Sequence, residues 1–482
     1  PEKILFVLLR QILIIMDTLI CPVATSTDAK VPLIIYLDFK SPYAYLAVEP
    51  TRKMLAELGV VADWRPFVLD IGSYLGTAKL GKGGKVAEQS RSKEQWSGVK
   101  YAYFDCRRYA NLKGMTVRGT VKIWNTNLPA VGWWWVKQQE SLQQQCASNS
   151  LMEKYIDAVY APFWRREFDA EDINAVEQVL IDVGANIEGF RDYAAGPGLR
   201  ANAQFQMDAF DSGIYGVPTY ILPSKAGAGA ENSDAEQKFF GREHLPLIRW
   251  YLQGQVGERP DVAYELADDA QVMADPEAPV DSALPVYIDV KAPQSYLALA
   301  GTRAMAEQQN IALDWHFFQG QPLRTPPVWE EGEGRGAMHR RIRGTYMGQD
   351  IQRYAPHKLK DLYVTERSNA TALGLAWVKA RALQDLSVSV DNYVEAILQR
   401  FWQQDQDIDS IASIEDVLNH LGVTLDGFAE FADSAGLAAV ETAAGQAQEL
   451  GVAVSPTYFI DTEPFQGRQH LPLLAARLKP QG

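Results

Sequence analysis

The chain has few cysteines, and their placement excludes most thiol chemistry. Only three occur in 482 residues, Cys21, Cys106 and Cys146, and the second half of the chain contains none. Because no two of them lie at a short spacing, we exclude a disulfide framework and a cysteine-rich metal site. This usage fits a reducing compartment, so we expect the protein in the cytoplasm.

Basic charge and long apolar runs are also scarce. The net charge is −14, which argues against nucleic acid and anionic membrane as partners, because lysine and arginine drive phosphate binding. Residues 4–16 form an apolar run that is too short to span a bilayer and is interrupted by Arg10. We expect residues 1–30 to lie outside the mature fold. A signal peptide over residues 1–26, and therefore export, is the alternative.

The sequence contains an internal duplication. Four blocks recur in the same order in its two parts, which chance does not produce. The paired blocks are 37–67 with 288–318, 127–137 with 369–379, 162–190 with 400–428, and 216–247 with 454–473. A chain of this length also exceeds one ordinary hydrophobic core. We therefore predict two domains, 31–253 and 285–480, joined by a linker over 254–284 that is rich in Asp, Ala, Pro and Glu.

Each copy has the pattern β-α-β, a helical stretch, then β-β-α. In the first copy the expected strands and helices are, in order, strand 31–38, helix 42–58, strand 60–69, a helical insertion over about 90–212, strands 216–222 and 239–240, and helix 244–252. This order is that of the thioredoxin fold interrupted by helices. The predicted fold class is therefore α/β, with two tandem thioredoxin-like domains that each carry an inserted helical subdomain.

The start of the first helix is the first candidate site. In thioredoxin-type folds the reactive sulfur lies there, because free N–H groups and the helix dipole stabilise an anion. This position holds Ser41 in the first copy and Ala292 in the second, and the position three residues later holds Ala44 and Ser295. Without a dithiol, these sites cannot exchange disulfides. What remains in the first copy is an anion site with a hydroxyl donor, suited to a thiolate that a cofactor supplies. A plain helix cap at Ser41 stays an equally open interpretation.

Two more motifs recur near the end of each copy. The turn at Val217-Pro218 could offer backbone groups to an extended peptide, and the segment Arg242-Glu243-His244 opens the last helix, where N–H groups favour a carboxylate. His244 is the only histidine of the first copy. We therefore expect no metal site there.

Three further groups are given structural roles. Lys40, beside Ser41, is expected to be a solvated surface residue, the alternative being that it adds a favourable charge to the anion site. The tryptophans at 124 and 133–135 are expected in the core, the alternative being that they line a pocket for an aromatic substrate. Cys106 and Cys146 are expected to be inert buried thiols.

The segments DFKSPYAYLA, WRPFVL, GVPTYI and FFGREHL together resemble the DsbA-like superfamily. The branch they are most similar to is the 2-hydroxychromene-2-carboxylate isomerase and kappa-class glutathione transferase family. The resemblance implies that Ser41 is catalytic and stabilises the thiolate of glutathione. It also implies that Val217, before a cis Pro218, pairs with the cysteinyl part of the cofactor, and that Arg242 and Glu243 face its γ-glutamyl end.

The chain departs from that family in two places. The family usually has Ser or Asn, then Asp and Arg, after the last glycine, where this chain has Arg242, Glu243 and His244. The family's Gly-Asn segment after the second strand is replaced by 76–85, which has no asparagine. The second copy has also lost the serine, and Ser295 lies a helical turn too far along to replace it. Its site is therefore expected to be degenerate.

The resemblance implies a glutathione-dependent isomerase or transferase acting on a small aromatic or electrophilic substrate. The alternative is a non-catalytic thioredoxin-fold binding protein. A DsbA-type oxidoreductase fits the fold and not the residues. Because related proteins commonly work as dimers of single domains, the two copies are expected to form an intramolecular pseudo-dimer.

Overall fold

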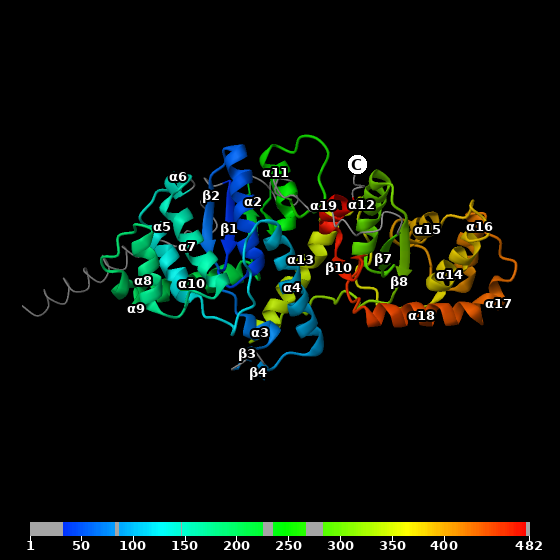
Figure 1. Ribbon diagram of the computed structural model, residues 1–482, viewed down its shortest axis with the longest axis horizontal. Helices are drawn as coiled ribbons and strands as arrows, with labels where there is room; N and C mark the ends of the chain where they lie inside the picture. Colours follow the sequence, from blue (N-terminus) through cyan, green and yellow to red (C-terminus); the bar gives the residue numbers. More distant parts are fainter. Residues whose placement is uncertain (1–31, 82–85, 146, 225–234, 267–282, 479–482) are drawn as a thin grey trace, which may run out of the picture. The chain divides into compact units, whose positions relative to one another are not determined.

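The structure is a computed structural model that describes residues 32–81, 86–145, 147–224, 235–266 and 283–478. Contacts between residues divide the chain into two units. Unit 1 comprises the residues up to Pro260 together with Glu330–Ile342, and unit 2 comprises Asp261–Trp329 and the residues from Arg343 onwards. Each unit contains one copy of the repeat and its own four-stranded sheet (Figure 1). The predicted N-terminal segment 1–30 lies outside the described residues.

The sheet of unit 1 has the strand order β2-β1-β5-β6. β1 (Leu33–Leu37) and β2 (Ala62–Pro66) are parallel and are joined by the helix α2 (Pro42–Leu58), while β5 (Thr219–Leu222) and β6 (Gln237–Phe240) are antiparallel additions. All five side chains of β1 are buried, as expected for a central strand with a continuous apolar run. The predicted β-α-β and β-β-α halves are confirmed.

The helical insertion of unit 1 lies between β2 and β5 in the sequence. It runs from α4 (Lys93–Leu112) through α5 (Asn127–Lys137), α6 (Leu142–Gln145), α7 (Leu151–Arg165), α8 (Ile173–Asp182) and α9 (Phe190–Ala195) to α10 (Pro197–Asp211). Before it come α3 (Ile71–Leu75) and the hairpin of β3 (Ala78–Leu80) and β4 (Val86–Gln89), which the sequence pattern did not predict. The unit's last helix is α11 (Leu245–Leu252).

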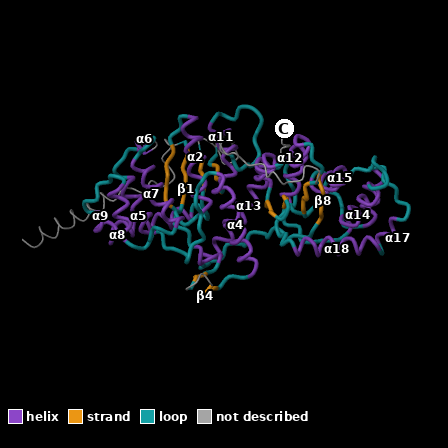
Figure 2. The backbone as a smooth tube through the Cα atoms, in the orientation of Figure 1, coloured by secondary structure: helices purple, strands orange, loops and turns teal. Residues whose placement is uncertain are grey.

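Unit 2 repeats this plan. Its sheet has the order β10-β9-β7-β8, and Figure 2 shows its strands packed among helices. Its elements are β7 (Leu284–Ile288), α12 (Pro293–Gln309), β8 (Leu313–Phe317), α14 (Ala370–Ala382), α15 (Val390–Trp402), α16 (Ile411–His420), α17 (Phe428–Ala432), α18 (Ala435–Glu449), β9 (Thr457–Ile460), β10 (Glu463–Gln466) and α19 (Leu471–Arg477). The tandem α/β architecture predicted from the repeat is therefore confirmed.

In the helical insertion of each unit, a buried tyrosine of one helix packs directly against a glycine of the neighbouring helix. Tyr155 of α7 lies against Gly132 of α5, and Tyr393 of α15 lies against Gly374 of α14. Each tyrosine is fully buried, and its hydroxyl donates to a carbonyl of the glycine's own helix at 2.8 and 2.9 Å. Any side chain larger than hydrogen at the glycine would displace the ring. This contact explains why the glycine recurs in both copies.

Contacts between residues group one segment of the second repeat copy with unit 1. Residues 330–342 were predicted within the second domain, yet they belong to unit 1. They include the start of α13 (Arg335–Tyr354). Within unit 1 the ring of His339 stacks on Tyr74 with centroids 3.8 Å apart, and Arg335 pairs with Asp70. Side-chain contacts distant in sequence therefore set this boundary.

The predicted linker is also shorter than expected. Val262 and Tyr264 are buried in unit 2, and the amide of Tyr264 donates to the carbonyl of Gln469 at 2.8 Å. Asp261 pairs with Arg468 at 2.8 Å. This short packed segment was not predicted, because the buried side chains of Val262 and Tyr264 stand within the acidic composition of 254–284. Residues 267–282 lie outside the described residues.

Candidate functional site

Ser41 lies at the amino end of α2, directly after the turn that follows β1. Its backbone is extended (φ −96°, ψ 115°), and its Oγ accepts a hydrogen bond from the amide of Ala44 at 3.2 Å. Pro42 follows as the first helical residue. Ser41 is therefore a true N-cap, as its sequence context indicated.

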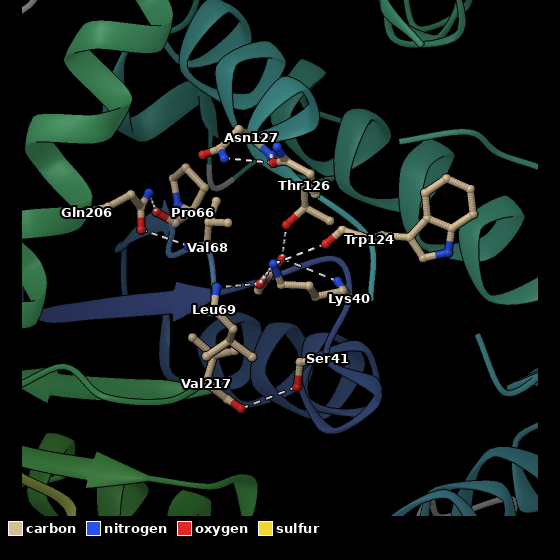
Figure 3. Close-up of polar contacts among 12 residues, drawn as sticks. Lys40, Ser41, Pro66, Val68, Leu69, Trp124, Thr126, Asn127, Gln206 and Val217 are labelled. Atoms are coloured by element: carbon tan, nitrogen blue, oxygen red, sulfur yellow. Dashed lines mark hydrogen bonds and ion pairs between the residues drawn. The ribbon is translucent and has the colours of Figure 1, made fainter. Parts of the chain in front are cut away.

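The same hydroxyl also contacts the second predicted motif. The Ser41 Oγ donates to the backbone carbonyl of Val217 at 3.3 Å, although the two residues are 176 positions apart (Figure 3). The peptide bond between Val217 and Pro218 is cis. Only 6% of Ser41 and 5% of Val217 is exposed. The fold therefore joins these two predicted site residues in one buried contact.

The third motif is tied to the same loop. The amide of Gly241 donates to the carbonyl of Pro218 at 2.9 Å. Arg242–His244 form a three-residue 3₁₀ turn, which separates the motif from α11. The guanidinium of Arg242 is buried over the ring of Tyr109 in α4, 4.5 Å from its centroid. Glu243 is half-buried, with its carboxylate folded back toward the Cα of Gly241. The Arg242 side chain therefore lies against the helical insertion.

A buried aspartate, which the sequence patterns did not single out, organises the turn before Ser41. Asp38 is 3% exposed, and its carboxylate accepts hydrogen bonds from the amide of Leu69 at 2.7 Å and the hydroxyl of Thr126 at 2.6 Å (Figure 3). It connects the end of β1 with the segment after β2 and with the start of α5. The recurrence of Asp38 as Asp289 in the second copy was the one signal that could have revealed it.

Lys40 was predicted to be a solvated surface residue, and that prediction is wrong. It is only 8% exposed. Its ammonium donates to the carbonyl of Trp124 at 3.3 Å and lies 3.7 Å from the carboxylate of Asp38. A buried ammonium requires such partners. Lys40 therefore contributes a fixed positive charge next to the N-cap of α2.

Among the described residues the one free cysteine is Cys106. The thiol of Cys106 is fully buried in α4, where burial raises its pKa well above the ordinary value, so it is the inert thiol that was expected. Among the residues that the structure describes, no cluster of three His, Cys, Asp or Glu side chains is arranged to hold a metal ion. No described helix is long and apolar enough to cross a membrane.

The corresponding position of unit 2 is arranged differently. Ala292 caps α12 without a side-chain hydrogen bond. The hydroxyl of Ser295 points inward, donates to the carbonyl of Asp289 at 2.6 Å and lies 2.5 Å from the hydroxyl of Ser455, the residue equivalent to Val217. The bond between Ser455 and Pro456 is cis. Ser295 therefore does not replace the missing hydroxyl at the helix start, as its position one turn along indicated.

Comparison with known proteins agrees with this architecture. A family model described as a DSBA-like thioredoxin domain matches residues 32–241 and 283–479. No curated protein matches the chain in sequence. Among solved structures, a 2-hydroxychromene-2-carboxylate isomerase is 17% identical, with 47% of this chain and 94% of that chain covered and a TM-score of 0.33.

Two further solved structures are similar at the same level. A probable DsbA oxidoreductase from Streptomyces coelicolor is 19% identical, with 49% of this chain and 94% of that chain covered and a TM-score of 0.34. The cytosolic disulfide reductase DsbM from Pseudomonas aeruginosa, solved with GSH, is 14% identical, with 38% and 88% covered and a TM-score of 0.28.

Proposed function

The chain belongs to the DSBA-like thioredoxin family through both of its units, and on that premise we propose that unit 1 binds glutathione with its sulfur at Ser41. With glutathione bound, unit 1 acts as a glutathione-dependent isomerase or transferase of the 2-hydroxychromene-2-carboxylate isomerase type. Its substrate is a small electrophilic aromatic compound. The observation that carries the proposal is the contact between the Ser41 hydroxyl and the carbonyl of Val217 beside Pro218. These are the two groups that the family resemblance assigns to the cofactor.

The residues around Ser41 fit a bound thiolate. The hydrogen bond from Ser41 to Val217 is 3.3 Å long, which exceeds the usual 2.5–3.0 Å of an O–H···O bond. A thiolate is a stronger acceptor than this carbonyl, so it can take the hydroxyl proton in its place. The positive end of the dipole of the 17-residue α2 and the buried ammonium of Lys40 add favourable charge.

The expected effect of the hydroxyl is large enough to matter at neutral pH. A hydrogen bond to a charged group contributes about 1.5–3 kcal/mol, which lowers a thiol pKa by about one to two units. When bound, glutathione supplies the nucleophile that adds to a conjugated double bond. The chain's own residues orient it: Ser41 donates to the sulfur, and the backbone of Val217 pairs with the cysteinyl unit.

A non-catalytic binding protein is the second candidate, and one observation favours it. Ser41 and Val217 are almost completely buried and already hydrogen-bonded to each other. If the loop of Val217 does not move, a tripeptide cannot reach the hydroxyl. A disulfide oxidoreductase has no comparable support, because neither Ser41 nor Ala44 carries sulfur.

Calorimetry on the full chain separates the two candidates. Glutathione is titrated into the wild type, Ser41→Ala and Ser41→Thr, with S-methylglutathione as the ligand that cannot form a thiolate. We expect Ser41→Ala to weaken glutathione binding by about tenfold or more and Ser41→Thr to retain it. S-methylglutathione should bind the wild type and Ser41→Ala with the same affinity.

The matched control is Ser150→Ala. Ser150 caps α7 by accepting from the amide of Glu153 at 3.0 Å, so its loss removes a cap of the same kind outside the site. The absence of any glutathione heat with the wild type, or equal affinity in wild type and Ser41→Ala, would favour the binding protein. Thioether formation with an electrophilic nitroaromatic then tests catalysis.

A further inference from the structure

Unit 2 contains a pocket of about 540 Å³ between the ends of its central strands and its helical insertion. We call it the α18 pocket. Val290 lines it after β7, Phe317 and Phe318 line it at the end of β8, and Val440 and Ala444 line it on α18. Asp289 and Lys291 are among its lining residues, so it lies directly beside the start of α12, although Ala292 and Pro456 do not line it. Its volume lies within the roughly 300–1,000 Å³ that is usual for small-molecule sites.

The repeat explains why this pocket is open in unit 2. The helices α10 and α18 have the same length of 15 residues, so Gln206 of unit 1 corresponds to Ala444. In unit 1 the amide side chain of Gln206 accepts from the backbone N–H of Val68 at 2.7 Å and donates to the carbonyl of Pro66 at 3.2 Å. It bridges α10 and the end of β2. Ala444 cannot make this bridge.

Other positions on the same walls are smaller in unit 2 as well. Phe39, which packs against Trp133 with centroids 5.4 Å apart, corresponds to Val290, and Tyr215 corresponds to Ala453. Both smaller residues line the α18 pocket. At three lining positions the second copy therefore has a smaller side chain than the first copy has at the equivalent position.

One side of the pocket is polar, because the guanidinium of Arg367 lies there. Arg367 lies beside the buried carboxylate of Asp289, with its Nη2 at 3.3 Å, and its Nη1 donates to backbone carbonyls. The Nε of Arg367 is buried and has no hydrogen-bond partner among the described residues. A buried donor left without an acceptor is unfavourable, because it has lost its hydrogen bonds to water. Because Arg367 lines the pocket, a ligand oxygen there would be a new acceptor for its guanidinium.

Both cations on the pocket wall are paired with carboxylates, which defines the ligand further. Arg367 is paired with Asp289, and the ammonium of Lys291 is paired with Asp409 at 2.5 Å. Glu441 also lines the pocket with an exposed side chain, so its negative charge disfavours an anionic guest. A site with its cations already neutralised and with mainly apolar walls favours an uncharged guest over an ion.

We propose that the α18 pocket binds a small, uncharged, mainly apolar ring compound that carries one oxygen acceptor, such as a ketone, and that this oxygen accepts from Arg367. Unit 2 is then a ligand-binding unit, although it lacks the serine of unit 1. The proposal does not depend on glutathione binding by unit 1.

Binding of acetylnaphthalene to the full chain tests the proposal, with ethylnaphthalene as the probe that lacks the oxygen. Ala444→Gln restores the side chain that unit 1 has at this position. Ala439→Gln, on an exposed position of the same helix outside the pocket, is the matched control. We expect Ala444→Gln to weaken acetylnaphthalene binding at least tenfold and Ala439→Gln to leave it unchanged. Ethylnaphthalene should bind the wild type about tenfold more weakly.

Two further variants keep the result interpretable. Ala372→Leu narrows the pocket from α14 and should also weaken binding, which matters if Ala444→Gln disturbs α18. Ser41→Ala should leave the affinity for acetylnaphthalene unchanged. No binding to the wild type, equal binding to wild type and both pocket variants, or loss of binding in Ser41→Ala would each overturn the proposal. Failure of glutathione to bind would not affect it.

Discussion

The two units differ at the N-cap of their first helix, and exchanging these residues measures what the Ser41 hydroxyl contributes to stability. The changes are Ser41→Ala in unit 1 and Ala292→Ser in unit 2. The backbone at the two positions is nearly the same, with φ −96° and ψ 115° at Ser41 and φ −88° and ψ 121° at Ala292. A serine at 292 can therefore adopt the capping geometry without a change in the turn.

The expected magnitude follows from the bonds that change. Ser41 accepts from the amide of Ala44 at 3.2 Å, and replacement of a capping serine by alanine costs about 0.5–2 kcal/mol. Its second bond, to Val217, is 3.3 Å long and adds less. We expect unit 1 to lose about 1 kcal/mol and unit 2 to gain a similar amount. Each corresponds to a change of about fivefold in an opening equilibrium.

Hydrogen exchange followed by mass spectrometry on the intact chain is the appropriate assay. A protein with two units has no single free energy of unfolding, whereas peptides from α2 and α12 report each unit separately. Ser41→Ala should speed exchange in α2 alone, and Ala292→Ser should slow it in α12 alone. Unchanged exchange in α2 after Ser41→Ala would refute the capping argument, and so would faster exchange in α12 after Ala292→Ser.

Three other predictions concern packing, pH and thiol reactivity. Gly374→Ala places a methyl group against the hydroxyl of Tyr393 and should destabilise unit 2 by about 1–3 kcal/mol. The control Gly445→Ala adds a methyl group that meets nothing within 4 Å and should stabilise unit 2 by up to about 1 kcal/mol. Urea titrations followed by hydrogen exchange of unit 2 peptides compare the two variants. The pKa of Asp314 is about 2, because hydrogen bonds from His316 and Lys379 outweigh burial, which alone would raise it. Its stabilising effect is therefore present above the ordinary value of 3.8 and is lost as the pH falls through about 2. Asp314→Asn should therefore cost about 1 kcal/mol at neutral pH, allowing for its partial exposure, much less near pH 2, where the carboxyl is half protonated, and nothing well below that pH in the same titrations. Cys106 should resist alkylation in the native chain and react after unfolding, because burial both covers its thiol and raises its pKa; rapid native alkylation, mapped by peptide mass spectrometry, would contradict this.

The elements of secondary structure could be predicted because local patterns determine them. The apolar run of β1, the Ser41-Pro42 start of α2 and the recurrence of both in the second copy each act over a few neighbouring residues. Repeated blocks then indicated that both halves share one fold. The hairpin of β3 and β4 was missed, because its short polar strands have no buried face to produce a pattern.

The candidate site was predicted in part. Ser41, Val217 and Pro218 were identified from their motifs, and the fold brings them together. Asp38 and the burial of Lys40 were missed, because a charged residue in a turn is normally exposed. Only partners from distant segments, Thr126 and the carbonyl of Trp124, make their burial possible.

The duplication, the α/β class and the absence of a dithiol could all be inferred from the amino-acid sequence, since each depends on residue identity or on local periodicity. Which side chains meet across the chain became known only from the folded structure. It assigned residues 330–342 to unit 1, and it opened a pocket in unit 2 where Ala444 leaves the place of Gln206 empty. The physical reason is that packing depends on the volume and hydrogen-bonding reach of side chains far apart in sequence, which no local pattern records.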